Sequence, residues 1–292
     1  MRTFIKFSLA ILALGLSTGI KAQTTTFGNM QNLIPRDQRA INQFDVKKDS
    51  AEFKGLSIDL GGAFALQFQA INSFNDQQVG SYTASNGTTI TNYRLNNLEN
   101  QFNLPTANMT IGAQLYDGVR VNLDLYLAAR HHNETWVKGG YLQIDKLDFI
   151  KKDFLAGFMK YATIKIGQME NNYGDAHFRR SDNADVMRNP FVNNPGVESY
   201  MQAPHIEVYY RMPSINSLVL VGVTNGQVNP DDVTNTAVAG KGSSNRPGVY
   251  GKFVFDSQVS DALRIRLSES VYYVSGTNKG SSLFSGDKAG TV

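Results

Sequence analysis

The sequence predicts an all-β protein, an antiparallel transmembrane β-barrel of the outer-membrane type. Apolar and polar residues alternate over segments long enough to cross a bilayer, which takes ~9–11 residues per tilted strand. Tight turns alternate with long loops rich in Asn, Gly and Ser. A meander with its short turns at one end and its long loops at the other is typical of such barrels.

The chain begins with a predicted secretory signal peptide, residues 1–22. Two basic residues precede an apolar stretch from Phe7 to Ile20, and Ala22 is the predicted end of the segment. This stretch is shorter than the ~20 residues of a transmembrane helix, and no later apolar stretch reaches that length. The predicted location is the bacterial outer membrane, with a periplasmic N-terminus.

The net charge argues against nucleic-acid binding, and the cysteine content excludes disulfide bonds. Cleavage removes Arg2, Lys6 and Lys21, so the 28 basic residues become 25, equal in number to the 25 acidic residues. The mature chain is then formally neutral, which argues against nucleic acid as a partner. The chain contains no cysteine, so disulfides are excluded although the protein is exported.

The region after the signal peptide divides into two parts. Residues 23–53 show no sustained alternation and are predicted to be an exposed N-terminal extension in the periplasm. Residues 54–292 are assigned to the β-barrel domain. Its first strand, within GLSIDLGGAFALQFQA, places Ile58 and Leu60 on one face and Asp59 on the other.

The second and third strands, 104–115 and 119–127, form a predicted hairpin. A three-residue loop pairs Leu115 with Val119, and the register that follows joins apolar residues to apolar residues. A two-residue loop would mix the two faces. The Asp-Gly pair in this loop predicts a turn in which Gly118 has a positive φ.

Six further strands continue the meander. They are predicted at 137–145, 160–169, 204–212, 217–224, 248–256 and 262–274. Glu269 interrupts the apolar face of the last strand, and a bulge there would accommodate it. The connection 146–159 is predicted to hold a short helix. Nine strands are counted in all, whereas single-chain bacterial barrels usually have an even number, so either the barrel has further strands or one strand is miscounted.

The alternative fold is a secreted soluble β-sandwich, whose strands also alternate. Soluble strands usually run to only ~5–6 residues, and Greek-key connections do not alternate between short and long. Aromatic residues near the strand ends fit the interface girdles of a barrel. These residues are Phe68, Tyr116, Trp136, Tyr209, Tyr210, Tyr272 and Tyr273.

In the barrel, the apolar strand faces contact lipid and the polar faces line the interior. The charged residues predicted to line this channel are Arg120, Asp124, Arg130, Lys165, Lys252, Arg264 and Arg266. Basic residues outnumber acidic ones on these faces, and rings of Arg and Lys are typical of anion-conducting pores. The sequence therefore predicts a mild preference for anions.

Residues 164–191, IKIGQMENNYGDAHFRRSDNADVMRNPF, resemble the phosphate-selective porin family, in which a strand ending in Gly-Gln precedes a long charged loop with Pro and Phe. The stretch KGLSIDLGGAFALQFQAIN is similar to the first barrel strand of related porins. The resemblance implies a 16- or 18-stranded porin that can assemble as a homotrimer. It also implies that the third outer loop, here residues 170–203, folds into the lumen and narrows it.

The basic residues of this implied constriction loop are Arg179, Arg180 and Arg188. Five acidic residues accompany them, so the loop is net acidic, and phosphate selectivity is not carried over to this chain. Arg179 and Arg180 are the predicted solute-contacting pair. The alternative is that they form surface ion pairs with Asp182 and Asp185.

No catalytic, metal or cofactor site is predicted. His131, His132 and Glu134 match no zinc-binding spacing, and PDDV at 230–233 lacks the spaced oxygen ligands of a calcium loop. No G-x-S-x-G nucleophile motif occurs, so an enzyme is not expected.

The predicted function is passive diffusion of small hydrophilic solutes through an outer-membrane porin. Its partners are then outer-membrane lipid and the solutes or anions that pass. One alternative is a non-conducting outer-membrane barrel whose loops bind ligands or proteins. The other is a secreted β-sandwich that acts as a binding module.

Overall fold

The computed structural model describes eight stretches of the chain. They are residues 30–34, 43–45, 48–70, 81–91, 100–127, 135–179, 202–225 and 247–275. Nearly all of the regular structure within them is antiparallel β-sheet.

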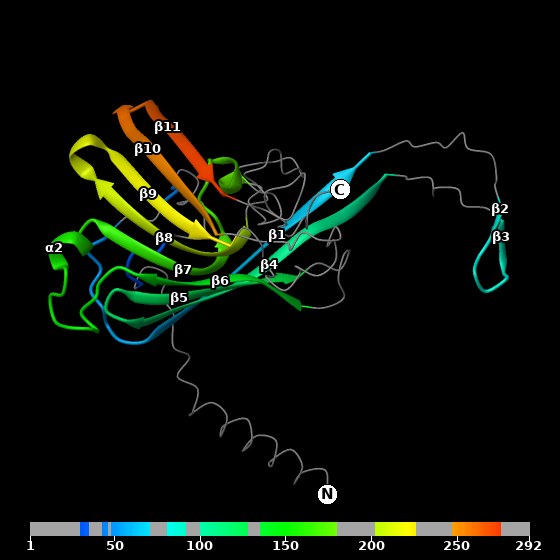
Figure 1. Cartoon of the computed structure of the whole chain (residues 1–292), viewed down its shortest axis with the longest axis horizontal. Helices are drawn as coiled ribbons and strands as arrows, with labels where there is room; N and C mark the ends of the chain where they lie inside the picture. Colours follow the sequence, from blue (N-terminus) through cyan, green and yellow to red (C-terminus); the bar gives the residue numbers. More distant parts are fainter. Residues whose placement is uncertain are drawn as a thin grey trace, which may run out of the picture.

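Nine strands form one sheet in which each strand pairs with the next along the chain (Figure 1). They are β1 (Ser57–Gln69), β4 (Gln101–Tyr116), β5 (Val119–Leu127), β6 (Thr135–Ile144), β7 (Ala162–Glu170), β8 (Gln202–Met212), β9 (Ser217–Thr224), β10 (Gly248–Ser260) and β11 (Leu263–Tyr273). The all-β fold class and the predicted order of nine antiparallel strands are confirmed. Among the described strands, β1 and β11 each pair on one side only, so the sheet has two open edges.

A small separate hairpin lies in the long connection between β1 and β4. Its strands β2 (Ser81–Thr83) and β3 (Thr89–Thr91) pair only with each other among the described strands. Gly87 in the turn has a φ of 82°, and the backbone N–H of Thr88 donates to Asn86 Oδ1 at 3.1 Å. The Asn-Gly dipeptide is the sequence signal for such a hairpin.

The helical elements are short. The helix α2 (Ala156–Met159) lies in the β6–β7 connection, where a short helix was predicted. Two 3₁₀ turns, η2 (Ala176–Arg179) and η5 (Pro213–Ile215), follow β7 and β8. Within the described part of the chain, no helix has the length and apolar character needed to cross a membrane.

The pairing register places side chains of one kind in rows that cross all nine strands. One row is entirely apolar: Ile58, Ala113, Val121, Leu142, Ile166, Ile206, Val223, Val249 and Tyr273. The adjacent row, on the opposite face, is Ser57, Gln114, Arg120, Gln143, Lys165, Glu207, Gly222, Tyr250 and Tyr272. The first row defines the apolar face of the sheet, and the second defines the polar face.

The exposure of the two faces is the reverse of that in a soluble protein. Large side chains of the apolar face are exposed, among them Ile58, Leu60, Phe64, Phe68, Leu123, Val137, Ile166, Ile206, Val221, Val223, Val249, Phe253, Leu267 and Val271. Charged side chains of the polar face are buried, among them Asp59, Arg120, Lys138, Glu207 and Lys252. Soluble domains bury the apolar face and seldom bury charges.

The β4–β5 turn differs from the prediction by one residue. Tyr116 pairs with Val119, so Asp117 and Gly118 form a two-residue loop and Leu115 lies in a bulge. The predicted pairing of Leu115 with Val119 is therefore wrong. Beyond the bulge, from Gln114–Arg120 onward, the two strands pair in the predicted register. Gly118 has a φ of 72°, as the Asp-Gly signal predicted.

The bulge that would accommodate Glu269 is absent from β11. The β10–β11 register is continuous from Val249–Tyr273 to Gln258–Arg264. Glu269 therefore stays on the apolar face, where it pairs with Phe253 and is exposed. Among the described strands, β11 pairs on one side only, so the carboxylate of Glu269 is not confined by a second neighbouring strand.

The N-terminal segment is not exposed throughout, as had been expected. Its described residues Met30, Gln31, Asn32 and Asp45 are buried against the sheet. The backbone N–H of Gly118 donates to Gln31 Oε1 at 2.8 Å, so Gln31 covers the β4–β5 turn. The expectation of an exposed extension is wrong for these residues, because the polar face offers hydrogen-bond partners that the segment occupies.

Among the described residues, two small apolar clusters are buried outside the apolar row. One packs on the polar face, where its members are Tyr209, Leu218, Leu220, Tyr250 and Val254. The other lies where α2 and the start of β7 meet the end of β6 and consists of Ile144, Met159 and Ala162. Apart from these clusters, many of the buried side chains of the polar face are polar or charged, among them Gln114, Gln143 and Glu207.

Candidate functional site

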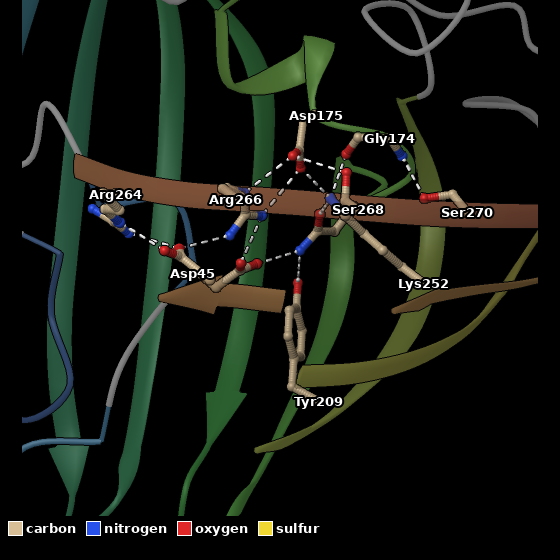
Figure 2. Close-up of polar contacts among 11 residues, drawn as sticks. Asp45, Gly174, Asp175, Tyr209, Lys252, Arg264, Arg266, Ser268 and Ser270 are labelled. Carbon is tan, nitrogen blue, oxygen red and sulfur yellow. Dashed lines mark hydrogen bonds and ion pairs between the residues drawn. The ribbon is translucent and has the colours of Figure 1, made fainter. Parts of the chain in front are cut away.

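A network of ion pairs on the polar face joins β10 and β11 to two segments outside the sheet (Figure 2). Arg266 of β11 lies at its centre, with Nη2 3.0 Å from Asp45 Oδ2 and Nε 3.0 Å from Asp175 Oδ2. Its Nη1 lies 3.1 Å from Asp256 Oδ2 of β10. Since Asp45 belongs to the N-terminal segment and Asp175 to the connection after β7, Arg266 ties both to the sheet.

Lys252 of β10 is the second cation of the network and is almost fully buried. Its Nζ donates to Asn172 Oδ1 at 2.7 Å and to the carbonyl of Gly174, and it lies 2.7 Å from Asp175 Oδ1. Three acceptors saturate the three N–H donors of an ammonium group. These partners offset the loss of hydration on burial.

The alternation of β10 and β11 explains why these charges meet. Lys252 and Asp256 are both alternate positions of β10, so their side chains lie on the polar face. Arg264 and Arg266 occupy the same face of β11. The register pairs Asp256 directly with Arg266. Arg264 binds the same carboxylate through two hydrogen bonds of 2.6 Å, the geometry that a planar guanidinium favours.

The connection after β7 carries two residues with lowered pKa. Burial alone would raise the pKa of Asp175, but hydrogen bonds from Arg266 and the charge of Lys252 hold the pKa of that carboxyl well below its usual range. Burial lowers the pKa of His177 to about 3, and the nearby charge of Lys252 acts in the same direction. At neutral pH, Asp175 is therefore ionised and His177 is neutral.

Glu207 of β8 is fully buried and forms the centre of a neighbouring cluster. Its Oε1 accepts a hydrogen bond from the Tyr250 hydroxyl at 2.6 Å and another from the backbone N–H of Asn172 at 2.7 Å. Its Oε2 accepts from the Tyr209 hydroxyl and lies 3.7 Å from His205 Nε2. The carboxylate is therefore held by three donors, as a buried charge requires.

A third polar cluster lies at the short-turn end of the polar face. Lys48 of the N-terminal segment has its Nζ 2.7 Å from Asp145 Oδ1. Asp145 also accepts from Thr163 Oγ1 at 2.6 Å and from Gln143 Nε2 at 2.7 Å. Gln143 Oε1 in turn accepts from Arg120 Nη2 at 2.8 Å. The N-terminal segment is thereby connected to one of the predicted channel-lining residues.

The structure describes six of the seven predicted channel-lining residues, and all six lie on the polar face. Lys252, Arg264 and Arg266 are brought into one network, whereas Arg120 belongs to the separate cluster at the short turns. Whether these residues line a channel stays a prediction.

Lys165 and Asp124 have mainly local partners. Lys165 Nζ lies 4.9 Å and 5.2 Å from the ring centroids of Tyr141 and Tyr209, within the range of cation–π attraction. Asp124 accepts a hydrogen bond of 2.9 Å from Asn122 of its own strand.

Several predicted positions lie outside the described residues. Among them are Arg130, Arg180, Arg188, His131, His132, Glu134 and the segment 230–233. Arg179 ends η2, and its side chain is outside the described part of the structure. The predicted constriction loop therefore stays a prediction. Among the residues that are described, no group of three or more His, Asp, Glu or Cys side chains is placed to hold a metal ion.

Sequence reasoning missed three contributors to the polar face. Asp45 lies in a segment without alternation, so nothing in its neighbourhood pointed to Arg266. Asn172 follows β7 in a connection that the strand pattern does not cover. Arg211 was detectable, because it continues the alternation of His205, Glu207 and Tyr209 along β8.

Comparisons with protein-family models, with curated proteins and with solved structures found no match to this chain. The fold and the site define it as an antiparallel all-β protein whose nine-stranded sheet has a buried polar face.

Proposed function

We propose that this chain forms an outer-membrane β-barrel that acts as a porin for small hydrophilic solutes. The observation that carries the proposal is the pair of adjacent rows across nine strands. One row is apolar and partly or fully exposed, and the other is largely polar and mostly buried. An exposed apolar surface of this extent is rare on soluble monomers. In a barrel, the apolar row would contact lipid and the polar row would face the polar interior, so each row would lie in a matching environment.

The lengths of the strands and the composition of the β6–β7 connection agree with this proposal. Eight of the nine strands contain 9–16 residues, against the ~9–11 needed to cross a bilayer at a tilt. The β6–β7 connection beside the apolar face exposes Phe149, Phe154 and Phe158 together with lysines, a composition that suits the lipid–water interface. In a membrane the open edges of β1 and β11 must be paired, so the proposal requires that the sheet closes.

The polar face supports a mild preference for anions. Its ion-pair network balances Lys252, Arg264 and Arg266 with carboxylates. Lys165 and Arg120, in contrast, have no carboxylate partner among the described residues. Unpaired cations along a polar interior favour the entry of anions.

Planar-bilayer recording of the purified full chain tests the function. Stepwise conductance with a reversal potential that shifts toward anion selectivity in a salt gradient is expected. The Arg120→Gln variant is expected to reduce the anion preference, and the exposed Lys151→Gln variant serves as the matched control. Absence of conductance from a chain that shows the heat-modifiable gel migration of a closed barrel would contradict the porin.

A second candidate function is a non-conducting outer-membrane barrel that binds ligands. It is favoured by the N-terminal segment, which contacts the polar face at Asp45 and Lys48 and would reduce the width of any lumen. The same recordings separate the two functions, because a barrel filled by its N-terminal segment passes no steady current. A soluble β-sandwich agrees less well with the structure, since it would bury the apolar face and expose the polar one.

A further inference from the structure

The β6–β7 connection carries a group of exposed apolar side chains at the short-turn end of the sheet (Figure 1). The backbone N–H of Asp145, which follows β6, donates to the carbonyl of Gly118 in the β4–β5 turn at 2.6 Å. The side chains in this group are exposed by 40–61%, and they are Phe149, Ile150, Phe154, Leu155 and Phe158. A contiguous group of large exposed apolar side chains indicates an interaction surface.

Packing against the sheet fixes the position of this surface. Met159 of α2 is almost fully buried in a cluster with Ile144 and Ala162. The ring of Phe158 stacks on Tyr210 of β8, with 5.5 Å between the centroids. Tyr210 lies four residues after Ile206 in a strand whose register is continuous, so both side chains are on the apolar face. The exposed surface therefore adjoins the apolar face of the sheet.

Leu155 has a backbone conformation that exposure to water does not explain. Its φ is 52°, in the left-handed region that is unfavourable for a leucine. Its side chain is 53% exposed, so the described residues cover only part of it. Strained residues persist where their surroundings require them. Contact with the acyl region of a membrane would supply the burial that the protein does not.

Two exposed lysines flank the apolar residues of this segment. Lys152 precedes Phe154, and Lys160 follows α2. Neither forms an ion pair with a described residue. The segment 152–160 contains one acidic residue, Asp153, against these two lysines, so its net charge is positive. Lysine stems can lie along an apolar surface while their ammonium groups reach charged headgroups.

We propose that this surface binds anionic phospholipid, with Phe154 and Leu155 among the acyl chains and Lys152 and Lys160 on the headgroups. The inference rests on the membrane location proposed above and adds the class of lipid that is bound. The apolar side chains alone would accept any lipid, and the lysines select a negative headgroup. A second copy of the chain is a poorer occupant, because it would bring the same positive charge to the contact.

Fluorescence quenching by brominated lipid tests the proposal in the full chain folded into vesicles. The chain has one tryptophan, so Trp136→Phe combined with Phe154→Trp gives a single reporter at the surface. The vesicles are phosphatidylcholine with a minor fraction of brominated phosphatidylglycerol, or the same fraction of brominated phosphatidylcholine. The apparent affinity at the reporter is expected to be about fivefold higher for the anionic lipid. Equal affinities would overturn the anionic selectivity.

Two pairs of substitutions test the role of the lysines. Lys152→Gln with Lys160→Gln removes both charges, and the affinities for the two lipids are expected to become nearly equal. Lys152→Arg with Lys160→Arg is the matched control, because it keeps both charges and is expected to retain the preference. A preference that survives the glutamine pair would overturn the assignment of the headgroup to these lysines.

A second reporter separates this proposal from that of the barrel. Val221→Trp in the Trp136→Phe chain probes the middle of β9 on the apolar face, where both lipids are expected to quench without preference. Quenching at Val221→Trp but not at Phe154→Trp would overturn the lipid site and leave the barrel intact. Quenching at neither position would contradict the barrel and the lipid site together.

Discussion

Single residues of the polar face show how ionised groups are accommodated out of water. Lys252 has three acceptors, and Glu207 accepts three hydrogen bonds, so both charges are compensated where they are buried. His177 is accommodated in another way. It is buried with its Nδ1 lacking a partner among the described residues, and it avoids the cost of a charge by staying neutral.

His177→Leu is expected to flatten the acidic side of the stability profile. The pKa of His177 is about 3 in the folded protein, compared with an ordinary value of 6.5. Between these values the unfolded chain binds a proton that the folded chain does not, so stability falls as pH decreases below 6.5. The loss approaches about 1.4 kcal/mol per pH unit, or about 2 kcal/mol by pH 5. Urea unfolding at pH 7.5, 6 and 5, followed by circular dichroism, measures the slope.

Asp175→Asn provides a control whose stability changes in a lower pH range than that of His177. The pKa of Asp175 is lowered, so its contribution is present at pH above the unfolded value and is lost only as pH falls below about 4. Asp175→Asn is expected to lower stability equally at pH 7.5, 6 and 5. A His177→Leu variant with the same slope as the unchanged chain would show that another group causes the acid sensitivity.

At the scale of elements, the strands were predictable because alternation is a local property of the sequence. The β4–β5 turn was predicted one residue too long, since its bulge is stabilised by Gln114, whose Nε2 donates to the Tyr116 carbonyl at 2.8 Å. The N-terminal segment was assigned to solvent because its partners are distant in sequence. Asp45 and Arg266 are 221 positions apart, and no local pattern encodes such a contact.

Gly118→Ala is expected to destabilise the β4–β5 turn. Gly118 has a φ of 72°, where an L-residue with a Cβ costs roughly 1–2 kcal/mol. A Cβ would also lie 2.7 Å from the backbone N of Lys146, which can move only if the neighbouring connection moves. The total loss is expected to reach at least about 2 kcal/mol, measured by urea unfolding.

Gly157→Ala is the matched control for this substitution. Gly157 lies in α2, where its φ is not positive and a Cβ would meet no atom within 4 Å. Alanine is expected to stabilise the helix by about 0.5–1 kcal/mol. If both glycine substitutions changed stability in the same direction and by the same amount, the positive φ and the contact with Lys146 would not explain the requirement for Gly118.

At the scale of the whole molecule, the two faces of the sheet impose different environments. The apolar row is continuous from β1 to β11, and no described element covers its central part. The polar face, in contrast, is covered by the N-terminal segment and by the start of the β7–β8 connection. A sheet with this distribution is stable only if something apolar, such as lipid, contacts the uncovered face.

Val221→Arg tests which solvent contacts the apolar face. Val221 lies in the middle of β9 and is 51% exposed. In a bilayer an arginine near the midplane of a barrel costs about 2–4 kcal/mol, whereas in water an exposed position accepts it at little cost. Urea unfolding of the chain folded into lipid vesicles is therefore expected to show a loss of about 2–4 kcal/mol.

Ile215→Arg is the control that makes this result specific to the apolar face. Ile215 has nearly the same exposure, 53%, but lies in the η5 turn between β8 and β9. A turn at the end of the strands lies near the lipid headgroups, where arginine costs only about 0–1 kcal/mol. A large loss for Val221→Arg with a small loss for Ile215→Arg is the pattern expected of a transmembrane strand. Equal and small losses at both positions would mean that water contacts the apolar face, and the barrel would then have to be abandoned.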